Sequence, residues 1–330
     1  MILLLGATGY IGQAFAAELR KRGKEFVSVT RSTTDYTRFG VLLQFIQNTR
    51  AEFLINCAGY TGKPNVDACE TVQADTLLGN ALLPQTIAHA CSAAGIPWGH
   101  VSSGCIYSGA KVMQSGQVRV VRDMTTPEFQ SVLARDRTTI QGFSEMDEPN
   151  FTFRRPPCSF YSGSKALGEE ALAEADNRYT WRLRIPFDEF DTPRNYLTKL
   201  QRYAKVYNNV NSLSHRGDFA AACLDLWECR APFGTYNVTN PGFVTSREVV
   251  AMIQRILKPA GAFEYWQSDA EFYQYAASAP RSNCVLDVSK ILAADIRIRP
   301  VLCALEETLH NWKRQAPPPV ECYQEDSHAK

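Results

Sequence analysis

The first twelve residues, MILLLGATGYIG (1–12), place an unbroken apolar run directly before three glycines spaced three residues apart. A short run that is apolar throughout is typical of a parallel strand buried on both faces. After the glycines, apolar residues recur at helical spacing as far as residue 22. The stretch therefore predicts a strand, a tight turn and a helix, which is the opening of an α/β fold of the doubly wound Rossmann type.

The glycine turn suits a dinucleotide. Its glycines allow a tight turn, a close approach of a pyrophosphate to the backbone and close packing of the helix, whose N-terminus offers unpaired N–H groups. A purely structural turn is the alternative, but the position between strand and helix favours dinucleotide binding. The residues expected to hold the cofactor here are Gly6, Thr8, Gly9, Tyr10, Ile11 and Gly12.

The end of the second predicted strand, 25–29, bears on which dinucleotide binds. An acidic side chain there would hydrogen-bond the 2′-hydroxyl of NAD and repel the 2′-phosphate of NADP. The sequence has Thr30, Arg31 and Ser32 instead. Arg31 can pair with a phosphate and Ser32 can donate to its oxygens, although Arg31 could also be a solvated surface residue. The pattern favours NADP(H) and leaves NAD(H) open.

The rest of the chain predicts two domains. Further strands are expected at 53–57, 98–102 and 179–185, with helices at 41–48 and 67–94. Residues 109–159 are polar, show too little apolar pattern for a core element, and are expected to form an insertion or lid. We expect a cofactor domain over 1–186 that includes this insertion, a smaller α/β substrate domain over 187–314, and a loose tail over 315–330.

The composition excludes several classes of protein. The chain has 330 residues and a net charge of +1, so it has no basic footprint for nucleic acid or an anionic membrane surface. No run approaches the roughly 20 apolar residues of a membrane span. The ten cysteines include no CxxC pair, so reduced thiols and no metal site are expected. A cytoplasmic location is the corresponding expectation.

Two later motifs complete a pattern that resembles a known family. NCAG stands at 56–59, a serine ends a later predicted strand, and YSGSK stands at 161–165. With the glycine turn, this order resembles the extended short-chain dehydrogenase/reductases over nearly the whole chain. The resemblance implies that the cofactor also contacts Asn56, Ala58 and Gly59, and that catalysis uses Ser103, Tyr161 and Lys165.

Tyr161 and Lys165 lie one helical turn apart, so both side chains project from one face. A neighbouring ammonium and the positive nicotinamide ring would lower the pKa of the tyrosine, which would then exchange a proton with a hydroxyl or carbonyl while hydride moves. By the family's pattern, Ser103 would hydrogen-bond the same oxygen and Lys165 would also hold the nicotinamide ribose. The alternative is an ordinary amphipathic helix.

Closer similarities point to one subfamily. Four segments look like the plant nucleotide-rhamnose synthases, which are 3,5-epimerase/4-reductases of a nucleotide-linked 4-keto-6-deoxyglucose. They are similar, more distantly, to dTDP-4-dehydrorhamnose reductase and GDP-fucose synthase. The resemblance implies that Cys105 serves in epimerisation with Lys199 as its partner. The segments are NCAGYTGKPNVDACE (56–70), VSSGCIY (101–107), SFYSGSKALGEE (159–170) and PRNYLTKLQRYAKV (193–206).

The chemistry explains why such a pair would be needed. Protons beside a ketone are acidified by enolate formation, so inversion needs a base on one face of the sugar and an acid on the other. A thiol and an ammonium can both be moved toward neutrality by a dry pocket or a neighbour. Packing is the alternative for Cys105, because free cysteine is among the most buried residue types. Lys199 could equally be a solvated helix lysine.

The resemblance also implies a substrate site. Lys63 stands where the plant pattern has arginine, which would fix a phosphate less firmly. Arg281 could bind a diphosphate or form a surface ion pair. The long insertion at 109–159 and the segment SHRGDF (214–219) depart from the plant pattern and leave the sugar and nucleotide open. The residues implied are Thr61, Gly62, Lys63, Asn65, Asn195 and Arg281.

We therefore expect an NADP(H)-dependent 3,5-epimerase/4-reductase acting on a nucleotide-diphosphate sugar. One alternative is a reductase without epimerase activity. Another is a redox-neutral epimerase or dehydratase, disfavoured because Gly104 and Cys105 replace the acidic pair of a 4,6-dehydratase. A nucleotide-binding sensor or scaffold is the non-enzyme alternative, although such proteins usually lose the tyrosine or lysine. The helix at 67–94 leaves a homodimer open.

Overall fold

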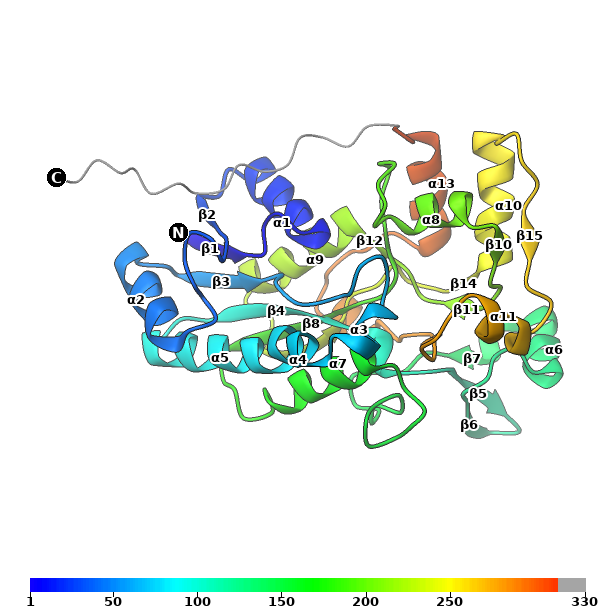
Figure 1. Cartoon of the computed structure of the whole chain (residues 1–330), viewed down its shortest axis with the longest axis horizontal. Coiled ribbons are helices and arrows are strands. Elements are labelled where there is room, and N and C mark those ends of the chain that lie inside the picture. Colours follow the sequence, from blue (N-terminus) through cyan, green and yellow to red (C-terminus); the bar gives the residue numbers. More distant parts are fainter. Residues whose placement is uncertain (314–330) are drawn as a thin grey trace.

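The computed structural model describes residues 1–313, and its centre is a parallel sheet of six strands (Figure 1). The spatial order is β2, β1, β3, β4, β8, β13. β2 and β3 lie on opposite sides of β1 in the sheet, so the strand order reverses there. The topological switch point therefore lies at the carboxyl ends of β1 and β3. This confirms the predicted doubly wound α/β fold. The strands are β1 (Ile2–Leu5), β2 (Phe26–Val29), β3 (Phe53–Asn56), β4 (Trp98–Ser103), β8 (Arg178–Leu183) and β13 (Gly234–Asn237).

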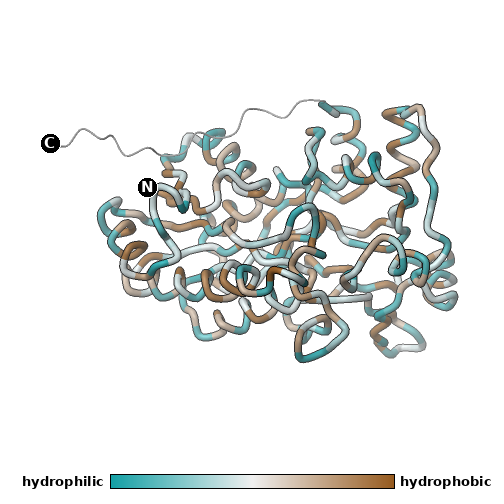
Figure 2. The backbone as a smooth tube through the Cα atoms, viewed as in Figure 1, coloured by the Kyte–Doolittle hydropathy of each residue, from teal (hydrophilic) through white to brown (hydrophobic). Residues whose placement is uncertain are grey.

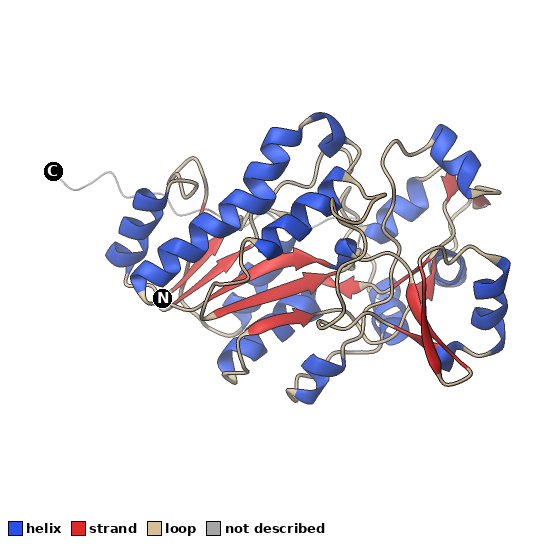
Figure 3. Ribbon diagram, turned by 90° about the horizontal axis from the view of Figure 1, so that it is seen from below, coloured by secondary structure: helices blue, strands red, loops and turns tan. Residues whose placement is uncertain are grey.

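Helices cover both faces of the sheet, as Figure 3 shows. Ile2 and Leu4 pack into the core on one face, against α1 (Tyr10–Lys21) and α9 (Arg216–Glu228). Leu3 and Leu5 pack into the core on the other face, against α2 (Phe39–Thr49) and α5 (Leu83–Ala94). A strand buried on both faces has no polar side to show, which is why the first strand is apolar throughout.

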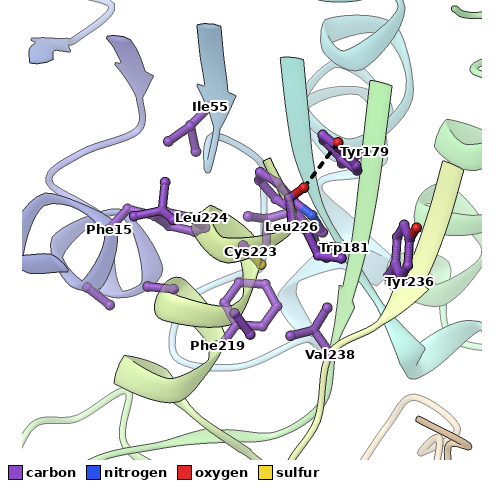
Figure 4. Close-up of a cluster of buried hydrophobic side chains, with 14 of the residues drawn as sticks. Phe15, Ile55, Tyr179, Trp181, Phe219, Cys223, Leu224, Leu226, Tyr236 and Val238 are labelled. Atoms are coloured by element: carbon purple, nitrogen blue, oxygen red, sulfur yellow. Dashed lines mark hydrogen bonds between the residues drawn. The ribbon is translucent and has the colours of Figure 1, made fainter. Parts of the chain in front are cut away.

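Trp181 on β8 is the centre of the first of these cores (Figure 4). Its ring stacks on Phe15 at a centroid distance of 5.7 Å, and Phe219 meets Phe15 edge-on at 5.9 Å. A Cβ added at Gly99 on β4 would lie 1.8 Å from the indole. The glycine therefore makes room for the tryptophan, and the pair fixes how β4 sits beside β8.

The predicted helix at 67–94 is interrupted. It consists of α3 (Ala68–Thr71), α4 (Gln73–Leu77), a π-helical turn (Leu78–Leu82) and α5. Pro84 supplies the reason, because its ring would clash with the carbonyl four residues earlier in a regular α-helix, and a wider turn avoids this clash. Leu78 and Leu82 are exposed on the outer face. A homodimer through this helix stays a prediction.

Residues 109–159 do contain core elements, so the expectation that they lack them is wrong. They form an antiparallel sheet with α6 (Pro127–Arg135), and Val112, Phe129 and Ile140 are buried in a cluster with later parts of the chain. The apolar pattern is diluted because the strands are short and β6 leaves its side chains largely exposed. The strands are β5 (Ala110–Gln114), β6 (Gln117–Val121) and β7 (Ile140–Gln141).

A third core is formed by residues from 187 onward and includes Phe187, Leu200 and Leu305. Figure 2 shows hydrophobic stretches along both parts of the molecule. The chain also returns to the sheet through α9 and β13, so residues after 187 contribute to the first core as well. The division into two domains at 186/187 stays a prediction. The remaining helices are α8 (Tyr196–Arg202), α10 (Ser246–Leu257), α11 (Asp269–Tyr275), α12 (Ser289–Ala293) and α13 (Val301–His310).

The short strands of this part form three two-stranded ladders. Within residues 1–313, no helix has both the length and the apolar character needed to cross a membrane. The predicted tail at 315–330 lies outside the described residues. The ladders pair β9 (Pro186–Phe187) with β12 (Ser214–His215), β10 (Lys205–Val206) with β15 (Glu264–Tyr265), and β11 (Val210–Asn211) with β14 (Val244–Thr245).

Candidate active site

The glycine turn joins β1 to α1 and lies against the end of β3. Gly6 has φ +73°, and a Cβ there would stand 2.6 Å from the backbone nitrogen of Ala58. A Cβ on Gly12 would stand 2.1 Å from the carbonyl oxygen of Gly6. Gly9 caps α1 without a side-chain hydrogen bond, so the first N–H groups of the helix are open to an anion. The turn fits a pyrophosphate.

The other predicted residues of this turn are also accessible. Thr8 is exposed, and Tyr10 and Ile11 are half-buried. Arg216 from α9 lies over the Tyr10 ring at 4.4 Å and donates to the Tyr10 carbonyl at 2.8 Å. Its guanidinium also pairs with Asp188 at 2.5 Å. Sequence reasoning missed Arg216, which lies 206 residues after Tyr10 and holds the turn in place. Only the departure from the plant pattern at 214–219 pointed to that segment.

The end of β2 carries the two residues predicted to choose the cofactor. Arg31 and Ser32 are both exposed. The Ser32 hydroxyl lies 2.8 Å from that of Thr30. Within residues 1–313, Arg31 makes no ion pair. The guanidinium is therefore accessible to a phosphate.

The segment after β3 brings the NCAG motif to the same place. Asn56 accepts a hydrogen bond from the Ala58 backbone at 3.0 Å and lies 3.0 Å from the ring of His100 through its own Nδ2. Burial, the largest cause, lowers the pKa of His100, so the ring is neutral and can accept this bond. Gly59 lies beside Lys165, because a Cβ there would stand 3.6 Å from Nζ.

Asn80, in the π-helical turn, fixes this segment to the catalytic helix. Its oxygen accepts from the Tyr60 backbone at 2.9 Å, while its amide donates to the Tyr60 carbonyl at 2.8 Å and to the Ser164 hydroxyl at 3.0 Å. Asn80 is fully buried. Sequence reasoning missed it, because a buried asparagine inside a helical pattern gives no sign of its partners.

The predicted catalytic residues come together at the end of β4. Ser103 is the last residue of β4, and α7 (Phe160–Glu170) carries both Tyr161 and Lys165. Tyr161 packs against the buried cluster that includes Cys105, and its phenol lies beside Ser103. Lys165 is buried, and its ammonium donates to the Val101 carbonyl on β4 at 3.2 Å. The arrangement can hold a carbonyl oxygen between a phenol and a hydroxyl.

The protonation of this group differs from the sequence expectation. Burial raises the pKa of Tyr161, and the nearby Ser103 hydroxyl offsets this only in part. Burial likewise lowers the pKa of Lys165. The expected lowering at Tyr161 assumed a bound nicotinamide ring, whereas in the protein alone burial is the larger effect. A protonated phenol is the form that donates a proton to a ketone oxygen.

Cys105 lies directly behind this group, in the 3-10 turn Gly104–Ile106. It is 4% exposed, and its backbone N–H donates to the Ser103 hydroxyl at 3.2 Å. Ser103 and Ser162 on α7 lie beside the thiol. Burial raises the pKa of the thiol, so it carries its proton. A protonated thiol can donate a proton but cannot accept one as a base.

Lys199 lies on α8 and is half-buried. Burial, with Arg194 as a second cause, lowers the pKa of its ammonium. This is the direction a base requires. Within residues 1–313, no hydrogen bond joins Lys199 to Cys105, and the two come from different parts of the fold.

The residues predicted for the sugar side form one turn after β3. Arg194 reaches across to donate to the Thr61 hydroxyl at 3.2 Å and to the Gly62 carbonyl at 3.0 Å. Asn65 accepts from a backbone N–H within the same turn at 2.8 Å, and Lys63 is exposed. The structure brings these four together, and it adds Arg194, which sequence reasoning missed.

Asn195 and Arg281 are engaged within the chain instead of open to a substrate. Asn195 caps α8, and its amide donates to two carbonyls and to the Asp188 carboxylate. Both polar atoms of this buried side chain are thereby satisfied. Arg281 makes a bidentate pair with Asp67, with both N–O distances at 2.6 Å. The ion pair, which the sequence left open for Arg281, is what the structure shows.

Comparison with curated proteins finds relatives among sugar-nucleotide enzymes. The chain is 32% identical over 290 residues to a trifunctional UDP-glucose 4,6-dehydratase/UDP-4-keto-6-deoxy-D-glucose 3,5-epimerase/UDP-4-keto-L-rhamnose-reductase of Arabidopsis thaliana, with 88% of this chain aligned. It spans 38% of the length of that relative. It is 30% identical over 292 residues to a bifunctional dTDP-4-dehydrorhamnose 3,5-epimerase/dTDP-4-dehydrorhamnose reductase of the same plant, covering 88% of this chain and 85% of the relative.

Among solved structures, the UDP-rhamnose synthase of Acanthamoeba polyphaga mimivirus has a similar fold. The TM-score is 0.78 at 22% sequence identity, with 94% of this chain and 98% of that chain covered. The family model described as the RmlD substrate binding domain matches residues 1–314. The chain therefore belongs to the RmlD substrate-binding family of extended short-chain dehydrogenase/reductases, which confirms the resemblance found in its sequence.

Proposed function

We propose that this protein reduces the 4-ketone of a nucleotide-linked 4-keto-6-deoxyhexose in nucleotide-rhamnose biosynthesis. The observation that supports this most directly is the position of Tyr161 beside Ser103 at the end of β4, with Lys165 one turn away on the same helix. Both relatives named above carry a rhamnose-forming reductase activity in their descriptions. The nucleotide in those descriptions is UDP in one and dTDP in the other, so both are candidates here.

The proposed reduction uses few residues. The turn 6–12 and the segment 56–59 would hold the nicotinamide cofactor, which supplies the hydride for C4. Ser103 hydrogen-bonds the ketone oxygen and orients it, and Tyr161 donates its phenolic proton to that oxygen. The carbonyl gains one hydride and one proton and becomes a hydroxyl. The Lys165 ammonium stabilises the phenolate that remains until a proton returns from solvent.

NADP(H) is the proposed cofactor. Arg31 is exposed at the end of β2, and no carboxylate lies at residues 30–32. A guanidinium there can pair with a 2′-phosphate in bidentate fashion. In Arg31→Ala, KM for NADPH should rise about 10-fold, the loss of one charge-assisted pair, while KM for NADH stays unchanged. An equal change for both cofactors would contradict this assignment.

Epimerisation at C3 and C5 is the second part of the proposal. Lys199 has a lowered pKa and would remove the proton from carbon, and Cys105 has a raised pKa and would return one from the opposite face. The phenol and hydroxyl that hold the ketone would stabilise the enolate between these steps. No hydrogen bond joins Lys199 to Cys105 within residues 1–313, which suits this division, because the sugar ring must lie between acid and base.

The test is incubation with UDP-, dTDP-, GDP- and CDP-linked 4-keto-6-deoxyglucose and NADPH in deuterated water, followed by product NMR. We expect NADPH oxidation with the UDP or dTDP sugar and deuterium at C3 and C5. Reduction without deuterium would leave a reductase alone. Failure to oxidise NADPH with any of the four sugars would overturn the proposal.

Cys105→Ser separates the two activities. We expect it to lose deuterium incorporation at one carbon or both while reducing an already epimerised 4-keto-rhamnose at the wild-type rate. Cys284→Ser is the matched control, because Cys284 is also a fully buried thiol and its sulfur lies 3.2 Å from the Gly104 carbonyl. Equal exchange in Cys105→Ser and Cys284→Ser would assign Cys105 to packing.

A further inference from the structure

A buried carboxylate lies behind the catalytic helix. Glu169 is on α7 four residues after Lys165, which is itself four residues after Tyr161. Residues at this spacing follow one stripe of a helix. The Glu169 side chain is 12% exposed, whereas that of the next residue, Glu170, is 41% exposed. Two adjacent glutamates of one helix thus have opposite surroundings.

Glu169 ties α7 to both neighbouring strands of the sheet. Arg182 on β8 donates to its carboxylate through Nε at 3.0 and 3.1 Å and through a terminal nitrogen at 2.6 Å. Ser102 on β4 donates to the other side of the carboxylate at 2.5 Å. Ser102 precedes Ser103 directly in β4, so this bond joins the tyrosine's helix to the serine's strand beside the reacting groups.

Arg182 extends the same contacts toward the cysteine. Its side chain is 6% exposed, and it donates to the Tyr107 hydroxyl at 3.0 Å. Tyr107 follows the turn that carries Cys105 and donates in turn to the Asp147 carbonyl at 2.7 Å. The buried ion pair is therefore in contact with each of the elements that carry Ser103, Cys105 and Tyr161.

The charges around Lys165 indicate a second role for Glu169. The titratable groups that face its ammonium are His100 on β4, Cys57 after β3 and Cys105, together with Glu169. Burial keeps the first three neutral, because it lowers the pKa of His100 and raises that of both thiols. Within residues 1–313, Glu169 is the carboxylate that faces Lys165. Its negative charge is shared with Arg182 and, farther out, with Arg178.

We propose that Glu169 is a positioning residue for the catalytic group: its carboxylate holds α7 against β4 and β8 through Arg182 and Ser102, and it supplies the counter-charge for the Lys165 ammonium. The turnover measurements below rest on the proposed reductase function. The spectroscopic measurement does not require turnover.

The first test is the pH profile of kcat in Glu169→Gln. Loss of the negative charge lets Lys165 lose its proton at lower pH, so the alkaline limb of the reduction should move down by about one pH unit. The loosened helix should also lower kcat about 10- to 100-fold, since small misplacements near the reacting groups have effects of this size. Glu170→Gln is the matched control, because its partner Arg154 is a surface residue, and it should keep the wild-type profile.

Ser102→Ala separates position from charge. It removes one hydrogen bond to the carboxylate and leaves every charge in place, so kcat should fall while the alkaline limb stays where it is in the wild type. Glu169→Asp keeps the charge but withdraws the carboxylate by one methylene, so it should lower kcat and shift the limb less than Glu169→Gln does, and it serves if Glu169→Gln does not fold. A limb shifted as far in Ser102→Ala as in Glu169→Gln would overturn the assignment of the charge to Glu169.

The protonation of Lys165 can be followed without any substrate. In protein labelled with 13C at the lysine Cε, the Lys165 signal is assigned by its loss in Lys165→Met, and its midpoint should fall by about one pH unit in Glu169→Gln and not in Glu170→Gln. An unmoved midpoint in folded Glu169→Gln would overturn the inference while the reductase proposal stands. A moved midpoint with no turnover by the wild type would instead support the inference and count against the proposed function.

Discussion

Two regions of the molecule present their polar groups in opposite ways. The turn at residues 6–12 leaves the first N–H groups of α1 open, with no side chain capping them. Asn195 and Arg281, beyond residue 187, are instead occupied by partners in their own chain. The polar groups of the first region are open to a ligand, whereas those of the second region hold its loops together.

The difference shows which kind of functional residue can be recognised from the sequence. A glycine turn after a strand is useful only if something approaches its backbone closely, so its chemistry follows from local geometry. An asparagine or arginine in a loop can serve a substrate or the fold equally well. Ser103, Tyr161 and Lys165 resemble the first region, because they lie together at the end of β4 and their motif spacing shows this in the sequence.

The largest expected effect is on Tyr161→Phe. Removing the phenolic proton should lower kcat of the reduction about 10³-fold, the size of a lost general acid. The NADPH dissociation constant should stay within about twofold, because the phenyl ring keeps its place in the site. Retention of more than a tenth of the wild-type kcat would mean that another residue donates the proton. The catalytic residues would then not resemble the first region.

Gly12→Ala tests the glycine turn itself. The added Cβ would stand 2.1 Å from the Gly6 carbonyl oxygen, so the turn must shift, at a cost of about 3 kcal/mol in the free energy of unfolding and with weaker NADPH binding. Gly40→Ala in α2 is the control, because a Cβ there meets nothing within 4 Å and should stabilise the helix by about 0.5–1 kcal/mol. Urea unfolding and NADPH titration of both variants decide the outcome.

The sequence could predict the parts of the fold that depend on local patterns. The run at 2–5, the glycines and the YxxxK spacing are local patterns, and the strands and helices that follow from them are observed. The packing of residues 109–159 and the return of β13 to the sheet depend on contacts between distant segments. Local periodicity contains no information on such contacts.

The site divides in the same way. The neighbours of the catalytic residues, such as Asn80, Arg216 and Arg194, act through hydrogen bonds across 20 to about 200 residues of sequence. None of them belongs to a motif that requires its residue type. They could be found only once the fold had brought their partners together.

Asn195→Ala tests the second region directly. The variant loses the cap of α8 and three donated hydrogen bonds, so we expect a loss of about 2 to 3 kcal/mol in the free energy of unfolding. KM for the sugar nucleotide should stay within about twofold, since no atom of Asn195 is left for a substrate. A tenfold rise in KM with unchanged unfolding would restore Asn195 to the substrate site.

The smallest effect is expected at Asp218, where charges join the two regions. Asp218 on α9 accepts from Arg299 at 2.8 Å and lies 3.3 Å from His215, and these partners lower its pKa to about 2 although burial opposes them. A carboxyl whose pKa is lower in the folded state stabilises the protein above its unfolded value of about 3.9, and this contribution is lost as the pH falls toward 2.

Asp218→Asn should therefore cost about 2 kcal/mol in the free energy of unfolding at pH 6, and the difference from the wild type should shrink between pH 4 and pH 2. Urea unfolding at a series of pH values measures both curves. Asp225→Asn, on the same helix but more exposed at 41%, is the control and should change stability by less than about 1 kcal/mol. If the two variants show the same pH dependence, the junction between the regions does not depend on Asp218, and the apolar contacts of α9 with the sheet hold it alone.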